Sequence, residues 1–167
     1  MLEERDLLKI TTAELAKRSE ISEAAIYKHF PSKRKIFEEL VVFFEESVFT
    51  RIKVMKEESK PEDFPGQLIA LVLKFCETNQ GFSRILTREV FTADEVKIID
   101  KVANCFDKIN IEIRQSIQEY ERTTKKKLNL NLAASCDLLL SCLEGQIQSF
   151  VRSKFKKDLS GSWEDQW

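Results

Sequence analysis

The residues of this chain with the most informative chemistry lie between Thr11 and Lys33. Hydroxyl side chains recur there directly before helix-forming runs, at Thr11 or Thr12, at Ser22 and at Ser32. A hydroxyl in that position accepts a hydrogen bond from a first-turn N–H group and begins a helix. The N–H groups that remain free at the first and last of these starts suit phosphate oxygens. We therefore expect helix N-termini here and a surface that binds phosphate.

Two short helices joined by a tight turn follow from this pattern. The first covers about residues 12–19 and the second covers residues 22–30. Pro31 ends the second helix because the residue before a proline is pushed out of helical space. Such a pair with a three- to four-residue turn is a helix-turn-helix, whose second helix enters the major groove of DNA. The alternative is an ordinary helical hairpin whose basic residues are solvated.

DNA contacts are expected at the helix starts and on the outward side of the second helix. Tyr27, Lys28 and Lys33 bring hydrogen bonds and charge to phosphates, while the small Ala24 and Ala25 let the backbone approach base edges and thymine methyl groups. The candidate DNA-binding residues are Thr11, Thr12, Ser22, Glu23, Ala24, Ala25, Tyr27, Lys28, His29 and Lys33. Although the whole chain has a net charge of −1, no acid occurs between Lys28 and Lys35, and the distribution of charge matters more than its sum.

The elements that must position these residues are predicted to be helices throughout. Four glycines and three prolines among 167 residues leave little room for sheets with tight turns. Apolar spacings of three and four predict helices at 33–57, at 64–78, around 82–86, from Thr92 to Tyr120, and at 131–156, with a loop at 122–127. The helix at 64–78 is apolar on several sides and is expected at the centre. The fold class is therefore all-α, with a helix-turn-helix head followed by a helical bundle.

The last of these helices carries a pattern that favours self-association. Ser141, Gly145 and Ser149 recur every four residues. A glycine inside a helix costs about 1 kcal/mol relative to alanine, so a close approach of another helix should offset it. The expected homodimer interface comprises Leu139, Ser141, Gly145, Ser149 and Phe150. A dimer suits DNA half-sites one helical turn apart, and the alternative is tight packing within one subunit.

Composition argues against several other classes of protein. No apolar run approaches the ~20 residues of a membrane span, and no secretory signal is recognisable. The cysteines lack paired metal or redox spacing and are expected to be buried and reduced; they are Cys76, Cys105, Cys136 and Cys142. His29 is the only histidine, which excludes a multi-histidine metal site. We expect a cytoplasmic protein with no metal and no cofactor, and an enzyme with an unrecognised site is the alternative.

The run from Thr11 to Phe37, centred on residues 26–33, resembles the DNA-binding domain of TetR-type regulators. This resemblance implies a helix-turn-helix domain with its linking helix at 1–51 and a helical regulatory and dimerisation domain at 52–167. The two last long helices of each subunit would pair into a four-helix dimer bundle. Glu20 stands where the family usually has a left-handed glycine, at a cost of roughly 1 kcal/mol.

The N-terminus departs from the family pattern. Members begin with a further helix, and residues 1–6 fall where that helix should be ending. We expect a start codon placed too late or a shortened chain. A shortened first helix would leave Leu15, Ile26 and Phe30 poorly covered and would weaken DNA binding.

A closer resemblance is to the branch of the family that acts in nucleoid occlusion. It rests on Phe43, Glu45, Ser47, Thr50–Ile52, Arg84–Thr87, Phe150–Ser153 and Phe155–Lys156. It implies that DNA-bound dimers engage the tubulin-like division protein FtsZ and block ring assembly over the chromosome. The matching partner-binding positions are Phe43, Arg51, Leu71 and Asn79, while Thr78 replaces a basic residue.

Two alternatives remain open on the sequence, one for the role of the aromatic residues and one for the function of the protein. Phe43 and Phe44 also fit a helix with one core face and one solvated face. The alternative function is the common TetR design, a repressor of a local operon that a small molecule releases from DNA. Such a protein needs a cavity with a few polar groups, and the helix at 64–78 offers mostly bulky aliphatic residues.

Overall fold

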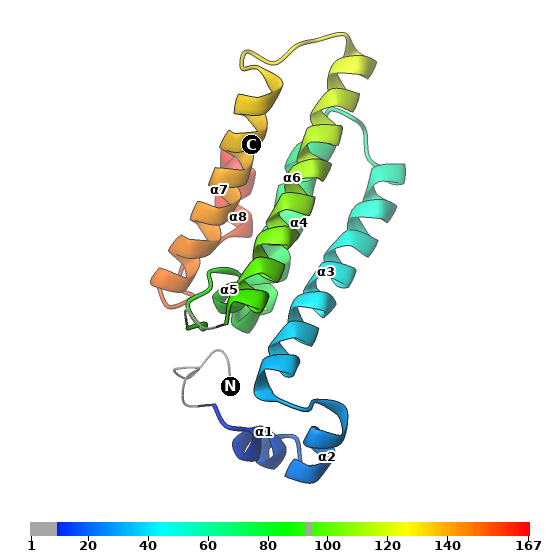
Figure 1. The fold of residues 1–167 in the computed structure, drawn as a ribbon. Coiled ribbons are helices and arrows are strands. Elements are labelled where there is room, and N and C mark those ends of the chain that lie inside the picture. The colour runs from blue at the N-terminus through cyan, green and yellow to red at the C-terminus, as the bar shows by residue number, and fades with distance from the viewer. Residues whose placement is uncertain (1–9, 93–94) are drawn as a thin grey trace.

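The computed structural model describes residues 10–92 and 95–167, and within these ranges it contains eight helices and no strand. They are α1 (Thr12–Arg18), α2 (Glu23–His29), α3 (Lys33–Glu58), α4 (Phe64–Thr78), α5 (Gln80–Leu86), α6 (Val96–Thr124), α7 (Leu132–Arg152) and α8 (Ser160–Gln166). Helices α1 and α2 form a small head at one end, and α3 leads from the head along a bundle made of the other helices (Figure 1). The predicted all-α class is confirmed. The expected shortening of the helix before α1 concerns residues 1–9, which lie outside the described residues.

Side-chain caps begin the three N-terminal helices as predicted. The hydroxyl of Thr11 accepts from the N–H of Glu14 at 3.2 Å, and that of Ser22 accepts from Ala25 at 3.1 Å. Ser32 does the same for α3, whose Lys35 N–H lies 3.2 Å from its Oγ. Each such cap is worth about 1 kcal/mol and fixes the residue at which its helix starts.

The core is centred on α4, as its apolar sequence predicts. Leu68, Ile69, Val72 and Leu73 are completely buried there. Helices α6 and α7 run side by side along the bundle (Figure 1) and add a continuous row of buried aliphatic side chains. Ile10 and Phe37 belong to the same cluster, so the base of the head is packed onto the bundle.

The long helix α6 corrects two predicted boundaries. Its cap is Glu95, whose φ of −93° and ψ of 37° are not helical, and its first residue is Val96. The Thr92 N–H donates to the Glu95 carboxylate at 3.0 Å. The helix continues through residues 122–124, which were predicted as loop, where the Thr124 hydroxyl donates to the carbonyl of Tyr120 at 2.8 Å. It ends at Thr124, because the left-handed φ of 59° at Lys125 breaks the helical path.

The end of α7 is also corrected. The helix stops at Arg152 rather than near Lys156 because Lys154 and Phe155 have φ values of 56° and 62°. This reversal brings the Phe155 ring onto that of Phe150, edge to face at 5.2 Å between centroids.

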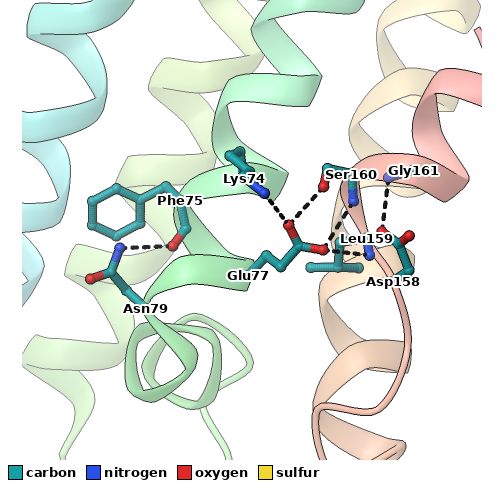
Figure 2. Close-up of polar contacts among 8 residues, drawn as sticks. All are labelled: Lys74, Phe75, Glu77, Asn79, Asp158, Leu159, Ser160 and Gly161. Carbon is teal, nitrogen blue, oxygen red and sulfur yellow. Dashed lines mark hydrogen bonds and ion pairs between the residues drawn. The ribbon is translucent and has the colours of Figure 1, made fainter.

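Helix α8 was not predicted from the sequence. Trp163 anchors it by donating its indole N–H to the carbonyl of Gly66 at 3.0 Å. Glu77 of α4 holds its start, accepting from the N–H of Leu159 at 3.1 Å and the hydroxyl of Ser160 at 2.7 Å (Figure 2). Helix α8 therefore exists through its contacts with α4 rather than through a periodic apolar face of its own.

Candidate DNA-binding head and partner groove

The head is built around a sharp turn between α1 and α2. Glu20 adopts the expected left-handed conformation, with φ of 56°, and the Ile21 N–H then donates to the carbonyl of Ala16 at 3.1 Å. Ala16 and Ile26 are buried between the helices, 4% and 6% exposed. The turn and these two contacts fix the direction of α2.

The outward side of α2 carries the residues predicted for it. Ala24, Lys28 and His29 are exposed, and Tyr27 is 48% exposed, whereas Ala25 is half-buried. Ser22 and Glu23 are also exposed at the start of the helix. These residues belong to α2, which lies in the head at the end of the molecule (Figure 1).

A hydrogen-bond chain that the sequence did not reveal joins α1 to this surface. The Thr12 hydroxyl donates to the Glu23 carboxylate at 2.6 Å and lies 3.0 Å from the Tyr27 hydroxyl. Threonine has a single O–H donor and a carboxylate only accepts, so Tyr27 must be the donor to Thr12. The two outward side chains are therefore held by one residue of the neighbouring helix.

The basic residues at the start of α3 differ in their contacts and in their exposure. Lys35 pairs with Glu39 at 2.6 Å and Glu38 at 3.6 Å on its own helix, and the hydrogen bond to Glu39 raises the pKa of Lys35. Lys33 is half-buried, with its Nζ 5.8 Å from the ring centroid of Phe37. Arg34 is exposed, as is Lys28 on α2.

The four predicted partner-binding residues meet in one groove. Phe43 and Arg51 on α3, Leu71 on α4 and Asn79 after α4 all line a surface groove of about 940 Å³ between these helices. The other lining residues are Glu46, Ser47, Val48, Thr50, Val54, Lys74, Phe75 and Thr78.

The exposure of Phe43 and Phe44 shows which part each residue plays on α3. Phe44 is completely buried, whereas Phe43 is 55% exposed and keeps ring contact with Phe82 at 5.9 Å. One of the two residues therefore belongs to the core and the other forms part of the groove wall.

Hydrogen bonds at the end of α4 fix the groove. The Asn79 amide donates to the carbonyl of Phe75 at 3.0 Å, and Lys74 donates to Glu77 at 2.7 Å (Figure 2). Burial alone would raise the pKa of the Glu77 carboxyl, but hydrogen bonds from Lys74, Ser160 and the backbone lower it to about 2. Glu77 therefore stays ionised and ties the groove side of α4 to α8.

The outward face of α7 carries part of the predicted dimer stripe. Ser141 and Gly145 are exposed, and a methyl group added at Gly145 would meet nothing within 4 Å. Ser149 is half-buried beside Lys157, and Leu139 lines a cavity at the far end of the bundle. The expectation for Phe150 is wrong: it is 1% exposed, because the reversal after α7 closes Phe155 over it.

The remaining chemical groups fit structural roles. Cys76, Cys105 and Cys136 are buried free thiols and Cys142 is half-buried. Burial raises the pKa of Cys76 to about 12 and that of Cys105 to about 11. Within the described ranges, no group of three or more His, Cys, Asp or Glu residues is arranged to hold a metal ion, and no helix there is long and apolar enough to span a membrane.

A helix-turn-helix head on a helical bundle defines a class of bacterial DNA-binding regulators, and family models match both parts. The model described as bacterial regulatory proteins, tetR family, matches residues 1–40. The SlmA-like model, described as tetracyclin repressor-like, C-terminal domain, matches residues 66–167. The chain belongs to the TetR family and, within it, to the SlmA-like group.

Relatives along the full chain agree with this assignment. The nucleoid occlusion factor SlmA of Marinomonas sp. is 38% identical over 168 residues, covering 100% of this chain and 85% of the relative. The nucleoid occlusion factor SlmA of Shewanella woodyi is 39% identical with the same coverage.

Solved structures support the fold. The fatty acid degradation regulator FadR from Bacillus halodurans superposes with a TM-score of 0.77 at 14% identity, covering 98% of this chain and 85% of that chain. The transcriptional regulator PfmR from Thermus thermophilus gives a TM-score of 0.68 at 19% identity, covering 89% of this chain and 85% of that chain. At these identities the likeness concerns the fold alone.

Proposed function

We propose that this protein is a nucleoid occlusion factor: a TetR-type homodimer that binds specific DNA sites and, when bound, inhibits FtsZ ring assembly over the chromosome. The observation that carries this proposal is the groove between α3 and α4. Four residues chosen as partner-binding from sequence resemblance, Phe43, Arg51, Leu71 and Asn79, line that one groove. This protein acts by binding rather than catalysis, in the cytoplasm and on the nucleoid.

The head supplies the DNA-binding half of the function. Its outward surface combines the small Ala24, the hydrogen-bonding Tyr27 and the basic Lys28 and Arg34. Tyr27 is 48% exposed, and the other three residues are exposed as well. Phosphate contacts position such a protein and base contacts give it specificity. Because α3 continues without a break across residue 51, the proposed boundary between the DNA-binding domain (1–51) and the second domain (52–167) falls within a helix that lines the groove. Groove residues from Phe43 to Arg51 lie before that boundary and those from Val54 to Asn79 lie after it, so one helix joins the head to the groove.

The groove supplies the partner-binding half. Its apolar wall contains Phe43, Val54 and Leu71, and its charged residues include Arg51 and Lys74. Such a surface suits a short peptide segment with apolar anchors and a carboxylate, because a few buried anchors dominate binding energy and charges fix the register. Since the groove lies along α3 and α4 rather than on α2, DNA and FtsZ can be bound together.

Dimerisation joins two heads for one DNA site. The exposed Ser141 and Gly145, with Leu138 at 60% exposure beside them, form an outward face on α7 that a second copy would cover. An isologous contact of this kind presents two recognition helices to symmetric half-sites.

FtsZ assembly in the presence of DNA tests this function. GTP-dependent assembly of FtsZ would be followed by light scattering with the protein and with duplex DNA that the protein has selected from a random library. We expect inhibition that is stronger with selected DNA than with shuffled DNA. Leu71→Ala should weaken FtsZ binding about 10-fold by removing an apolar anchor, and Arg51→Glu should weaken it further.

Lys53→Glu is the matched control, because it makes the same charge change on the same helix at an exposed position outside the groove lining. It should inhibit FtsZ as the unaltered protein does. Unchanged FtsZ assembly at saturating protein and DNA would contradict the proposal.

A second function, a ligand-released repressor, is favoured by one feature. A cavity of about 470 Å³ lies between the ends of α4, α6, α7 and α8, lined mainly by apolar residues that include Ile117, Leu138 and Trp167. Its size is in the range of small-molecule sites. Release of the selected DNA by a small apolar compound, with no effect on FtsZ, would favour this function over the first.

A further inference from the structure

Glu23 is an acidic residue at the part of the head that meets DNA in the proposed function. It is the first residue of α2 and is exposed, and N-terminal residues of a recognition helix contact base edges. A carboxylate there is repelled by the phosphate backbone. That repulsion is offset only where DNA offers the carboxylate a hydrogen-bond donor.

The geometry leaves one oxygen of Glu23 available for such a donor. Its Oε1 accepts from the Thr12 hydroxyl at 2.6 Å, and within the described part of the chain its Oε2 accepts no hydrogen bond. Tyr27 completes the chain by donating to Thr12 over 3.0 Å. Linked hydrogen bonds of this kind reinforce one another and restrict the orientation of the carboxylate.

We propose that Glu23 reads the amino group of a cytosine in each half-site and that Thr12 is the positioning residue that aims it. This inference rests on the proposed DNA-binding function. Cytosine presents its N4 amino donor in the major groove, whereas adenine presents a donor beside an acceptor, N7. A carboxylate only accepts hydrogen bonds, so it matches cytosine and leaves the adenine acceptor unpaired.

Selection from a random duplex library, followed by sequencing of the bound DNA, tests this assignment. The unaltered protein should select a cytosine at the same position in each of the two half-sites, and this selection should depend on Glu23. Glu23→Ala should reduce the preference for that cytosine about 10-fold while the rest of the selected site stays the same. Glu23→Gln should shift the preference toward adenine, because an amide donates and accepts side by side.

Glu20→Gln is the matched control. It removes the same negative charge from an exposed position three residues earlier, outside α2, and should raise affinity for all sequences without changing base preference. A change of preference in this variant would mean that charge, not readout, explains the effect and would overturn the assignment.

The role of Thr12 has its own readout. Thr12→Val preserves the shape but removes the hydroxyl, and should weaken the cytosine preference at the same position as Glu23→Ala. Thr12→Ser keeps the hydroxyl and should restore the preference, which a merely structural role would not predict. An unchanged cytosine preference in folded Glu23→Ala would overturn the proposal while leaving DNA binding intact. Failure of the unaltered protein to select any sequence would instead overturn the proposed function.

Discussion

Glu20 shows how one residue can be tolerated in a position that suits another. Its φ of 56° lies in the left-handed region, where a side chain costs roughly 1 kcal/mol and glycine costs nothing sterically. The turn still forms because Ala16 and Ile26 are buried beneath it. The direction of α2 therefore depends on packing that outweighs a local backbone penalty.

Glu20→Gly is expected to stabilise the protein by up to about 1 kcal/mol, since relief of the left-handed strain exceeds the added flexibility of the unfolded chain. Thermal or urea unfolding measures the change. Lys17→Gly, inside α1, is the opposing control and should destabilise by about 1 kcal/mol. Equal effects of the two glycines would show that the turn carries no strain.

At the scale of elements, α4 contacts both the groove and α8. One side lines the groove through Leu71 and Lys74, and the other holds α8 through Glu77 and Gly66. Lys74 belongs to both, because it lines the groove and donates to Glu77 at 2.7 Å. The position of α8 is thus tied to the residues that support the groove.

Glu77→Gln should loosen α8 and destabilise the protein by about 1–2 kcal/mol, because charge-assisted hydrogen bonds are lost. The folded pKa of about 2 lies below the ordinary 4.5, so the ionised form is the one stabilised by folding. Its contribution is complete above about pH 4.5 and is lost as pH falls toward 2. The stability difference between the unaltered protein and the variant should narrow over the same pH range.

Tryptophan fluorescence measures the docking of α8 directly, because both tryptophans of the chain, Trp163 and Trp167, lie on or next to it. Asp107→Asn, at an exposed position on α6, is the control and should change neither emission nor stability. Unaltered emission in Glu77→Gln would show that Glu77 does not hold α8.

Local signals and tertiary contacts explain which features the sequence predicted. Caps at Thr11, Ser22 and Ser32 involve residues three apart, so a short window contains the whole interaction. The Thr12–Glu23–Tyr27 chain and α8 depend on residues brought together only by folding. Phe150 was wrongly assigned to the dimer interface for the same reason. Positive φ values after α7 turn the Phe155 ring back over Phe150, and a periodic apolar pattern in the sequence gives no sign of that turn.

The groove and the dimer face could be predicted only in part. The groove residues came from family resemblance, because no spacing rule joins α3 to the end of α4. The small residues of α7 did follow from spacing, and two of them, Ser141 and Gly145, face outward.

At the scale of the whole molecule, function requires two heads, and the proposed interface is the face around Gly145. Gly145→Leu should convert the dimer to monomers and weaken binding to a two-half-site DNA by more than 10-fold, because the side chain blocks close helix approach. Within one protomer nothing lies within 4 Å of an added Cβ, so folding should be unimpaired. Sedimentation measures the mass, and Glu57→Leu, exposed near the end of α3, controls for added apolar surface. A dimeric Gly145→Leu protein would place the interface elsewhere.

A genome-wide map of where the native protein binds tests the central claim most directly. A nucleoid occlusion factor must mark much of the chromosome and leave free the region where division occurs. We predict many sites spread along the chromosome and few near the replication terminus, with binding lost when the outward residues of α2 are replaced. One or two sites beside its own gene would contradict the account and indicate a local repressor.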